Sequence, residues 1–248
     1  MRIVFSRKGF DSEAGGTPSP IISNRPISLP IPTTRRSETT YGTIGLGEIV
    51  ATVTKGRLGA SNLCHEDPMF FGGKCAFGQT GNAQAHLEKQ AVGVGDTFLF
   101  FGLFLEEGSR DPHHRIFGYL HIEKVNTVGA KSGTQLIPKG FPRRHPHTIG
   151  EWNDNNTIYV GRGTTAKFAH LGLRLSKPEG PTSRWRIPAW LSETGLTYHR
   201  KPDRWSRQNE LQVVGRGQEF VANIGDRKAP HEWLMKMITL IETPRSDH

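Results

Sequence analysis

Short apolar runs of the kind that form strands are spread along the first half of this chain. Residues 2–6 place Ile3, Val4 and Phe5 before a polar Ser-Arg-Lys-Gly turn, which predicts a short strand. Residues 98–105 and 115–125 are dominated by Phe, Leu, Ile, Tyr and Val on either side of a polar connection. They predict a β-hairpin, with His113 and His114 solvated at its turn.

The remaining pattern is weaker. Residues 157–161 and 168–175 resemble further short strands, and residues 82–92 consist of good helix formers behind Asn82, a suitable cap. Residues 231–241 carry an apolar stripe at helical spacing and predict a closing helix. Residues 61–81 show neither period and are interpreted as a functional loop, and residues 11–36 as a Pro-rich loop that is either ordered or disordered.

The composition favours many turns over long helices. The chain has 29 Gly and 16 Pro among its 248 residues and is 35% hydrophobic. We therefore expect one domain over residues 1–248 of the α+β class, rich in strands, with long Gly/Pro-rich loops and a few helices. The Gly-Asp entry to the first hairpin strand and Gly118 in the second are similar to PUA-like barrels, so either such a barrel or a mixed sheet is expected.

The net charge, the cysteines and the apolar stretches of the chain indicate its partners and its location. Lys and Arg number 32 against 23 Asp and Glu, a net charge of +9, which suits a polyanionic partner such as nucleic acid or nucleotide. Two cysteines give no disulfide framework, and the N-terminus does not resemble a signal peptide. The longest apolar stretch is far shorter than the roughly 20 residues that span a bilayer. We expect a cytoplasmic protein without a membrane partner.

The densest polar motif follows the first strand, in the sequence SRKGFDSEAGG. Arg7 and Lys8 could clamp a phosphate, Asp11 could act as a base or positioning acceptor, and neighbouring glycines allow close backbone approach. The motif matches neither the P-loop nor the dinucleotide fingerprint. The alternative is a solvated turn with incidental charges.

A second candidate group is His65 and Asp67, in the sequence CHEDP, together with His86 on the expected helix. Two imidazoles and a carboxylate are the ligand set of a non-haem iron site, and zinc accepts the same donors. The three residues are therefore candidates for metal ligands, for acid–base catalysis or for structural hydrogen bonding. Cys64 and Cys75 lack the spacing of a zinc pair. The basic loop around Arg143 to His147 is interpreted as a solvated surface, which could at most contact a phosphate backbone.

A third group lies late in the chain. Tyr198, His199, Arg204 and Trp205 combine stacking surface, a cation and an imidazole, which suits a base or nucleotide pocket. Gln218 and Glu219 could read a base edge or orient a catalytic group. A strand-end turn with a core tryptophan explains the same residues equally well.

The segments SRKGFDSEAGGTPSPI, CHEDP, FGQTGNAQAHLEKQAVGVGDTFLFFGLF, HRIFGYLHI, LTYHRKPDRW and GRGQEFV together resemble the bacterial and phage family named nucleotide modification associated domain, type three. The resemblance covers nearly the whole chain. It implies a role beside DNA base hypermodification systems, with DNA or a nucleotide as the partner. The polar residues within the matching blocks are Ser6, Arg7, Lys8, Asp11, His65, Asp67, Gln79, His86, Asp96, His199, Arg204, Gln218 and Glu219. Glu66 stands where an apolar residue is expected, as either a third ligand or a solvent-facing side chain.

Two functions follow as hypotheses. The first is an enzyme that modifies a nucleotide or DNA base, with Asp11, His65, Asp67, His86, His199 and Glu219 as catalytic groups and an iron or zinc ion on His65, Asp67 and His86. Its substrate would contact Ser6, Arg7, Lys8, Gln79, Tyr198, Arg204, Trp205 and Gln218. The second is a non-catalytic reader that captures a modified base with Trp205, Tyr198 and Gln218. The crowding of titratable groups in Gly-rich loops favours the enzyme.

Overall fold

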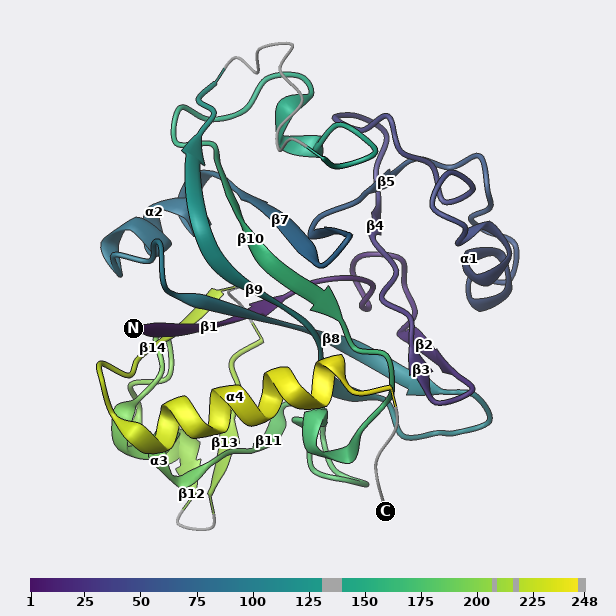
Figure 1. Ribbon diagram of the computed structural model, residues 1–248. Helices are drawn as coiled ribbons and strands as arrows, with labels where there is room; N and C mark the ends of the chain where they lie inside the picture. Colours follow the sequence, from purple (N-terminus) through teal and green to yellow (C-terminus); the bar gives the residue numbers. More distant parts are fainter. Residues whose placement is uncertain (131–139, 207–208, 216–218, 245–248) are drawn as a thin grey trace.

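A large mixed sheet forms the centre of the molecule (Figure 1). The computed structural model describes residues 1–130, 140–206, 209–215 and 219–244. The main path of the sheet runs β14-β1-β8-β9-β10-β7-β6, and the β2–β3 pair joins it at β8. Its strands are β1 (Arg2–Arg7), β2 (Ser19–Ile22), β3 (Arg25–Pro26), β6 (Met69–Phe71), β7 (Lys74–Gln79), β8 (Thr97–Glu106), β9 (His113–Thr127), β10 (Thr157–Thr165) and β14 (Glu219–Asn223).

Small elements surround this sheet. The strands β4 (Ile31–Pro32) and β5 (Cys64–His65) pair with each other, and β11 (Arg184–Arg186), β13 (Glu210–Gln212) and β12 (Trp205–Ser206) form a three-stranded sheet. The helices are α1 (Gly47–Val53), α2 (Gly81–Lys89), α3 (Ala189–Thr194) and α4 (Lys228–Glu242), with 3-10 turns η1 (Pro146–Thr148), η2 (Leu171–Leu173) and η3 (Pro202–Arg204).

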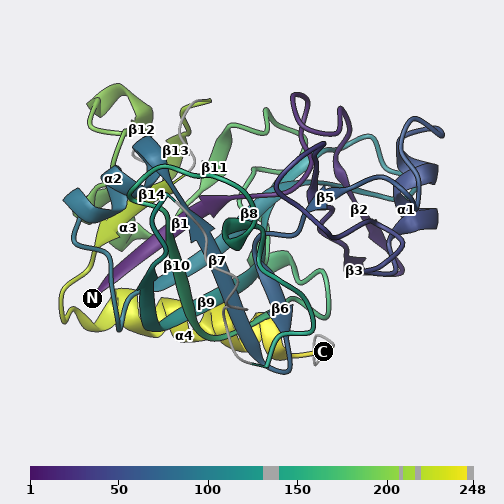
Figure 2. The same cartoon turned by 90° about the horizontal axis from the view of Figure 1, so that it is seen from above.

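Strand β8 is apolar along most of its length because both faces of the sheet are covered. Leu99 and Phe101 point to one side, where they join the core that includes Trp185 and the buried residues of α4. Phe98 and Phe100 point to the other side, against Phe77 and the helix α2. Figures 1 and 2 show α4 lying along one side of the sheet, with α1 at the far end from β14.

A third, smaller core holds the segment between β1 and β5. Phe10, Leu29, Tyr41, Val50 and Cys64 are buried together there, under α1. The segment therefore has its own apolar anchor beside the main sheet, and it fixes the β1 exit turn against β5 through the β4–β5 pair.

Several predicted elements are confirmed. The structure contains the first strand, the helix near residues 82–92, the hairpin of β8 and β9, the strand near residues 157–161 and the closing helix. The α+β, strand-rich class is confirmed, and of the two expected architectures the mixed sheet is the one present: the strands of the described residues do not close into a barrel. None of the helices in the described ranges is long and apolar enough to cross a membrane.

Three local expectations are wrong. Residues 61–81 are not a loop throughout, because β7 runs inside the main sheet between β10 and β6. Residues 168–175 contain the short turn η2 instead of a strand. His113 and His114 lie inside β9, with only 5% and 9% of their surface exposed, because β9 begins earlier than the apolar pattern suggests.

Candidate functional site

Three short elements bring a carboxylate and three imidazoles together. His65 ends β5 and Asp67 follows two residues later, beside β7. His145 and His147 flank Pro146 at the turn η1, which packs on β7. Residues almost eighty positions apart in the sequence thus meet at the edge where β5, β7 and η1 converge.

Asp67 is the centre of this cluster. Its Oδ2 lies 3.6 Å from Nε2 of His147 and 3.7 Å from Nε2 of His65, and its Oδ1 accepts a hydrogen bond from the Gly78 amide at 3.0 Å. Burial alone would raise the pKa of Asp67, but contacts with His145 and His65 outweigh it and hold the pKa well below its usual range. Asp67 is therefore an anion at neutral pH.

The hydrogen bonds of Asn156 determine the tautomer of His147. The Asn156 amide nitrogen donates to the carbonyls of His147 and Gly129, so its Oδ1 is left as an acceptor. This oxygen lies 2.6 Å from Nδ1 of His147, which must then carry the proton. Burial lowers the pKa of His147 to about 3, so the ring is neutral and its Nε2 lone pair faces Asp67.

His145 has the opposite tautomer. Its Nδ1 accepts a hydrogen bond from the His147 amide at 3.2 Å, so a neutral ring carries its proton on Nε2. That nitrogen lies 3.3 Å from Asp67 Oδ1, although the alignment falls short of a full hydrogen bond. His145 thus presents a proton to Asp67, whereas His147 presents a lone pair.

Among the described residues, His65, Asp67 and His147 offer a set of ligand atoms to one ion. One donor atom from each lies within 4.8 Å of the others. A metal with ligands at about 2.1 Å in tetrahedral directions separates neighbouring donors by roughly 3.4 Å. The observed 3.6 Å and 3.7 Å from Asp67 to the two histidines are close to this spacing.

An aromatic stack holds the His147 ring. Trp152 lies parallel to it, with ring centroids 4.1 Å apart and planes 13° apart, and the Arg36 guanidinium covers the other face of Trp152 at 4.5 Å. On the β7 side, a Cβ added to Gly78 would lie 2.4 Å from the His147 ring. Close approach of the histidine loop therefore needs glycine at this position.

An ion pair ties the histidine loop to the Asp67 segment. Arg143 donates from Nε and Nη2 to the two carboxylate oxygens of Glu66, at 2.9 Å and 2.6 Å. Glu66 is thus neither a metal ligand nor a solvent-facing residue, the two roles expected from sequence. The expectation that residues 143–147 form a solvated surface is also wrong, since His145 and His147 are buried.

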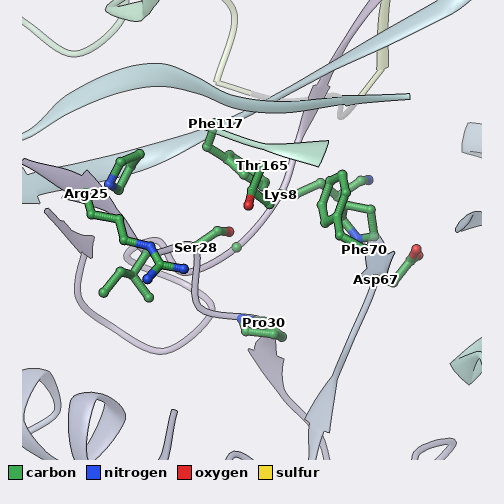
Figure 3. Close-up of a pocket in the computed structure, with 12 residues that line it drawn as sticks. Lys8, Arg25, Ser28, Pro30, Asp67, Phe70, Phe117 and Thr165 are labelled. Carbon is green, nitrogen blue, oxygen red and sulfur yellow. The ribbon is translucent and has the colours of Figure 1, made fainter. Parts of the chain in front are cut away.

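A cavity of about 300 Å³ opens from this cluster toward the turn after β1. Of the sequence candidates, it is lined by Arg7, Lys8, Asp11, His65, Asp67 and Gln79, together with His147 and Trp152. The structure therefore brings six predicted residues to one site. A smaller cavity of about 160 Å³ shares Lys8 and Asp67 with the larger one and is also lined by Arg25, Ser28, Pro30 and Phe70 (Figure 3).

The two basic residues of the turn differ in their partners. Lys8 forms a buried ion pair with Glu219 at 3.0 Å, and Gln79 donates to the same Glu219 oxygen at 2.7 Å. Arg7 donates to the carbonyl of Gly215 at 3.0 Å and more weakly to that of Val214, and its Nε has no hydrogen-bond partner among the described residues. These hydrogen bonds of Arg7 go to backbone carbonyls, whereas the charge of Lys8 is paired with the Glu219 carboxylate.

Asp11 has a structural task in its turn. Its Oδ1 accepts hydrogen bonds from the amides of Glu13 and Ala14, at 2.8 Å and 2.7 Å. The carboxylate thereby shapes the loop that forms one wall of the cavity.

His86 is absent from the metal-type cluster. It lies on α2, where its ring packs against Tyr198 at 4.6 Å and its Nε2 lies 3.2 Å from the Thr197 hydroxyl. Burial lowers its pKa, against the attraction of Glu219. The structure thus replaces His86 with His147 as the third member of the expected His-Asp-His set.

The late candidates occupy separate places. Both ring nitrogens of His199 are used by backbone groups, at 2.8 Å to the Thr197 carbonyl and 3.1 Å from the Val214 amide, and Trp205 donates to the His199 carbonyl. Arg204 donates to the Gln212 carbonyl and is not among the residues that line the cavity beside Asp67. Gln218 lies outside the described residues.

Ser6 and Glu219 lie opposite each other on β1 and β14. Both are buried, and the Ser6 hydroxyl and one Glu219 oxygen have no hydrogen-bond partner among the described residues. They stand behind Lys8 and Gln79, one layer away from the cavity.

Sequence reasoning missed His145, His147, Trp152 and Asn156. The His-Pro-His sequence was a usable sign, because two imidazoles separated by one residue are common metal-ligand candidates. Cys64 and Cys75 add nothing to the cluster: burial raises the pKa of Cys64 to about 12 and that of Cys75 well above its usual value, so both remain thiols.

A comparison with known proteins identifies the family of this chain. The sequence profile described as Nucleotide modification associated domain 3 matches residues 2–223, which include every element from β1 to β14. No curated protein and no solved structure matches the chain. The chain belongs to the Nucleotide modification associated domain 3 family, whose name associates it with nucleotide modification.

Proposed function

We propose that this protein is a metal-dependent enzyme that acts on a nucleotide or a nucleobase. In this proposal His65, Asp67 and His147 hold one divalent first-row metal ion, iron or zinc. Three protein ligands leave further positions open for water or substrate. A metal held in this way supplies a Lewis acid or an activated water to a substrate in the adjoining cavity.

One observation carries the proposal: the Nε2 lone pair of His147 faces an ionised carboxylate oxygen at 3.6 Å. Two acceptors that face each other in a buried place repel unless a cation lies between them. The proton that could relieve this repulsion is held on Nδ1 by Asn156. A metal ion satisfies both groups, with Asn156 as the residue that orients the histidine from behind.

Arg7 is the residue proposed to bind the phosphate of the substrate. Both Arg7 and Lys8 line the cavity, but Lys8 would have to break its ion pair with Glu219 to bind a phosphate. Burial lowers the pKa of Arg7, partly offset by Asp11 and Glu13, and an arginine stays charged throughout the neutral range.

The alternative of a non-catalytic reader has less support. Its stacking residues are dispersed, since Tyr198 packs on His86 and the Trp205 indole nitrogen bonds to the chain itself. The metal-type cluster, by contrast, shares one cavity with Arg7.

Metal binding tests the proposal first. Protein purified without chelators should contain one equivalent of a first-row metal, and the stripped protein should bind Zn²⁺ in calorimetry. Asp67→Asn and His147→Ala should weaken that affinity by at least about 100-fold. His86→Ala is the matched control and should bind as wild type; equal binding by all of these proteins would contradict the proposal.

Nucleotide binding at the metal is the second test. With Co²⁺-loaded protein, the proton signals of a deoxynucleoside monophosphate should broaden, and Arg7→Ala should reduce the effect. A nucleotide whose signals are unaffected by the loaded wild type would show that the metal site does not serve this substrate.

A further inference from the structure

A row of hollows extends from the metal-type cluster across the molecule. The cavity of His65, Asp67 and His147 shares Arg7 with a second cavity of about 280 Å³, whose other wall contains His114 and Ser183. Beyond it lies a third, open cavity of about 500 Å³ on the small sheet of β11, β13 and β12.

Ser183 marks the boundary between the second and third cavities. Its hydroxyl accepts a hydrogen bond from Gln212 at 2.8 Å, and Gln212 lines the third cavity. The second and third cavities are therefore neighbours, on either side of this hydrogen bond. Each of the three cavities is roughly as large as a pocket for one small ligand, which is about 300 Å³ or more. Together they therefore offer more space than a single nucleotide needs.

The far end of this row is positively charged. Residues 174–215 contain eight Lys and Arg but four Asp and Glu, a ratio of two to one, whereas the rest of the chain has 24 Lys and Arg against 19 Asp and Glu. Arg184 and Arg186 are both exposed and flank the buried Trp185 on β11, so both side chains leave the sheet on its outer face.

Two carboxylates, Glu210 and Asp203, lie among several cations there. Glu210 accepts a hydrogen bond from Lys177 at 2.8 Å and lies 3.9 Å from the Arg184 guanidinium. The hydrogen bond from Lys177 is the main cause of its lowered pKa, and Arg184 and Arg186 add to it. Asp203 lines the same cavity, but Arg204 and the exposed Arg200 and Lys201 surround it in the sequence. A surplus of positive charge therefore faces solvent.

We propose that the outer face of β11–β13 binds the phosphates of a nucleic-acid strand, one nucleotide of which reaches the metal cavity past Arg7. This rests on the proposed function and narrows its substrate to a nucleotide within a strand. The strand's backbone would follow the row of cavities, with Arg184 and Arg186 at its far end. Phosphate contacts of this kind give affinity without sequence preference and weaken as salt rises.

The test uses a fluorescent single-stranded DNA of about 12 nucleotides, within the usual span of such surfaces. Anisotropy titrations compare wild type with the double variant Arg184→Glu and Arg186→Glu. The matched control is Arg162→Glu with Lys236→Glu, which changes the net charge equally at exposed positions on β10 and α4.

The double variant should bind the DNA at least about tenfold more weakly near 0.1 M salt. The magnitude of the slope of log affinity against log salt should fall by roughly 1.4, because two phosphate contacts on a single strand are lost. The control should change little. Equal weakening in both variants would overturn the proposal, because the effect would then be one of net charge, and so would the absence of binding by wild type.

Failure of the strand-binding proposal can be distinguished from failure of the proposed function. The Co²⁺-induced broadening of a free deoxynucleoside monophosphate should be the same in wild type and in the Arg184→Glu, Arg186→Glu variant. If that broadening is present while the oligonucleotide does not bind, the substrate is a free nucleotide and the strand proposal is wrong.

Discussion

A single amide decides the chemistry of His147. Asn156 is fully buried and makes two hydrogen bonds to carbonyls, so its remaining oxygen can only accept, and it directs the His147 proton away from Asp67. His145 differs by one hydrogen bond and presents a proton instead. Two histidines separated by one proline thus have different roles, which residue type alone does not reveal.

Removing the amide should therefore weaken metal binding without touching a ligand. We expect Asn156→Ala to lower Zn²⁺ affinity by about 10–100-fold, the usual effect of losing a hydrogen bond behind a histidine ligand. Asn126→Ala is the control, since that side chain bonds to the Ile158 carbonyl, on the hairpin strands. Calorimetry on the metal-free proteins measures the Zn²⁺ affinities. An unchanged Zn²⁺ affinity in Asn156→Ala would show that Asn156 does not set the tautomer of His147 in the way described.

At this scale the sequence predicted part of the site. His65 and Asp67 were candidates because a histidine and an aspartate two positions apart in extended backbone face the same way. His86 was chosen as their partner because it lies near them in sequence on an apparent helix. The true neighbour, His147, comes from a loop whose burial depends on Gly78, Trp152 and the Glu66–Arg143 pair, contacts with no local signature.

The site is built where β7 meets the turn η1. The strand β7 was missed because its run KCAFGQ is short and contains a glycine, which in isolation resembles a loop. The sheet neighbours β10 and β6 pair with it on both sides and supply the order that the pattern lacks. Long strands such as β8 were predictable because nearly all their residues are apolar, which indicates a buried strand without knowledge of its neighbours.

The contact between β7 and η1 at Gly78 should not tolerate an added methyl group. In Gly78→Ala the new Cβ would lie 2.4 Å from the His147 ring and 2.8 Å from that of His145. We expect a loss of about 1–3 kcal/mol in the free energy of unfolding, with weaker metal binding, because the loop must move off β7. Urea unfolding measures the first effect and calorimetry the second.

Gly93→Ala provides the comparison. A Cβ at that position meets no atom within 4 Å, so the unfolding free energy should change by less than about 1 kcal/mol. Equal stability of the Gly78 and Gly93 variants would show that the histidine loop does not press on β7 as described.

The whole molecule should be sensitive to acid because histidines are buried inside its central sheet. Burial lowers the pKa of His113 to about 4 and that of His114 to about 3, and Trp185 donates to Nδ1 of His114. Unfolded histidine titrates near 6.5, so below that pH the unfolded chain binds more protons than the folded one. The unfolding free energy must therefore fall as pH falls from about 6.5 toward 4.

Each of the two histidines should contribute about 2 kcal/mol of this loss by about pH 5. Urea unfolding near pH 7.5 and pH 5 gives the total, and His114→Gln should reduce the difference by its share of about 2 kcal/mol. An undiminished difference in that variant would mean that His114 does not remain neutral in the folded protein.

The proposed activity depends on a metal ion held by three particular residues. Anomalous diffraction from crystals soaked in Zn²⁺ tests this most directly. We predict one strong peak about 2.0–2.2 Å from Nε2 of His65, a carboxylate oxygen of Asp67 and Nε2 of His147. A peak on His86, or no peak beside Asp67 at a Zn²⁺ concentration that saturates the protein in solution, would contradict it.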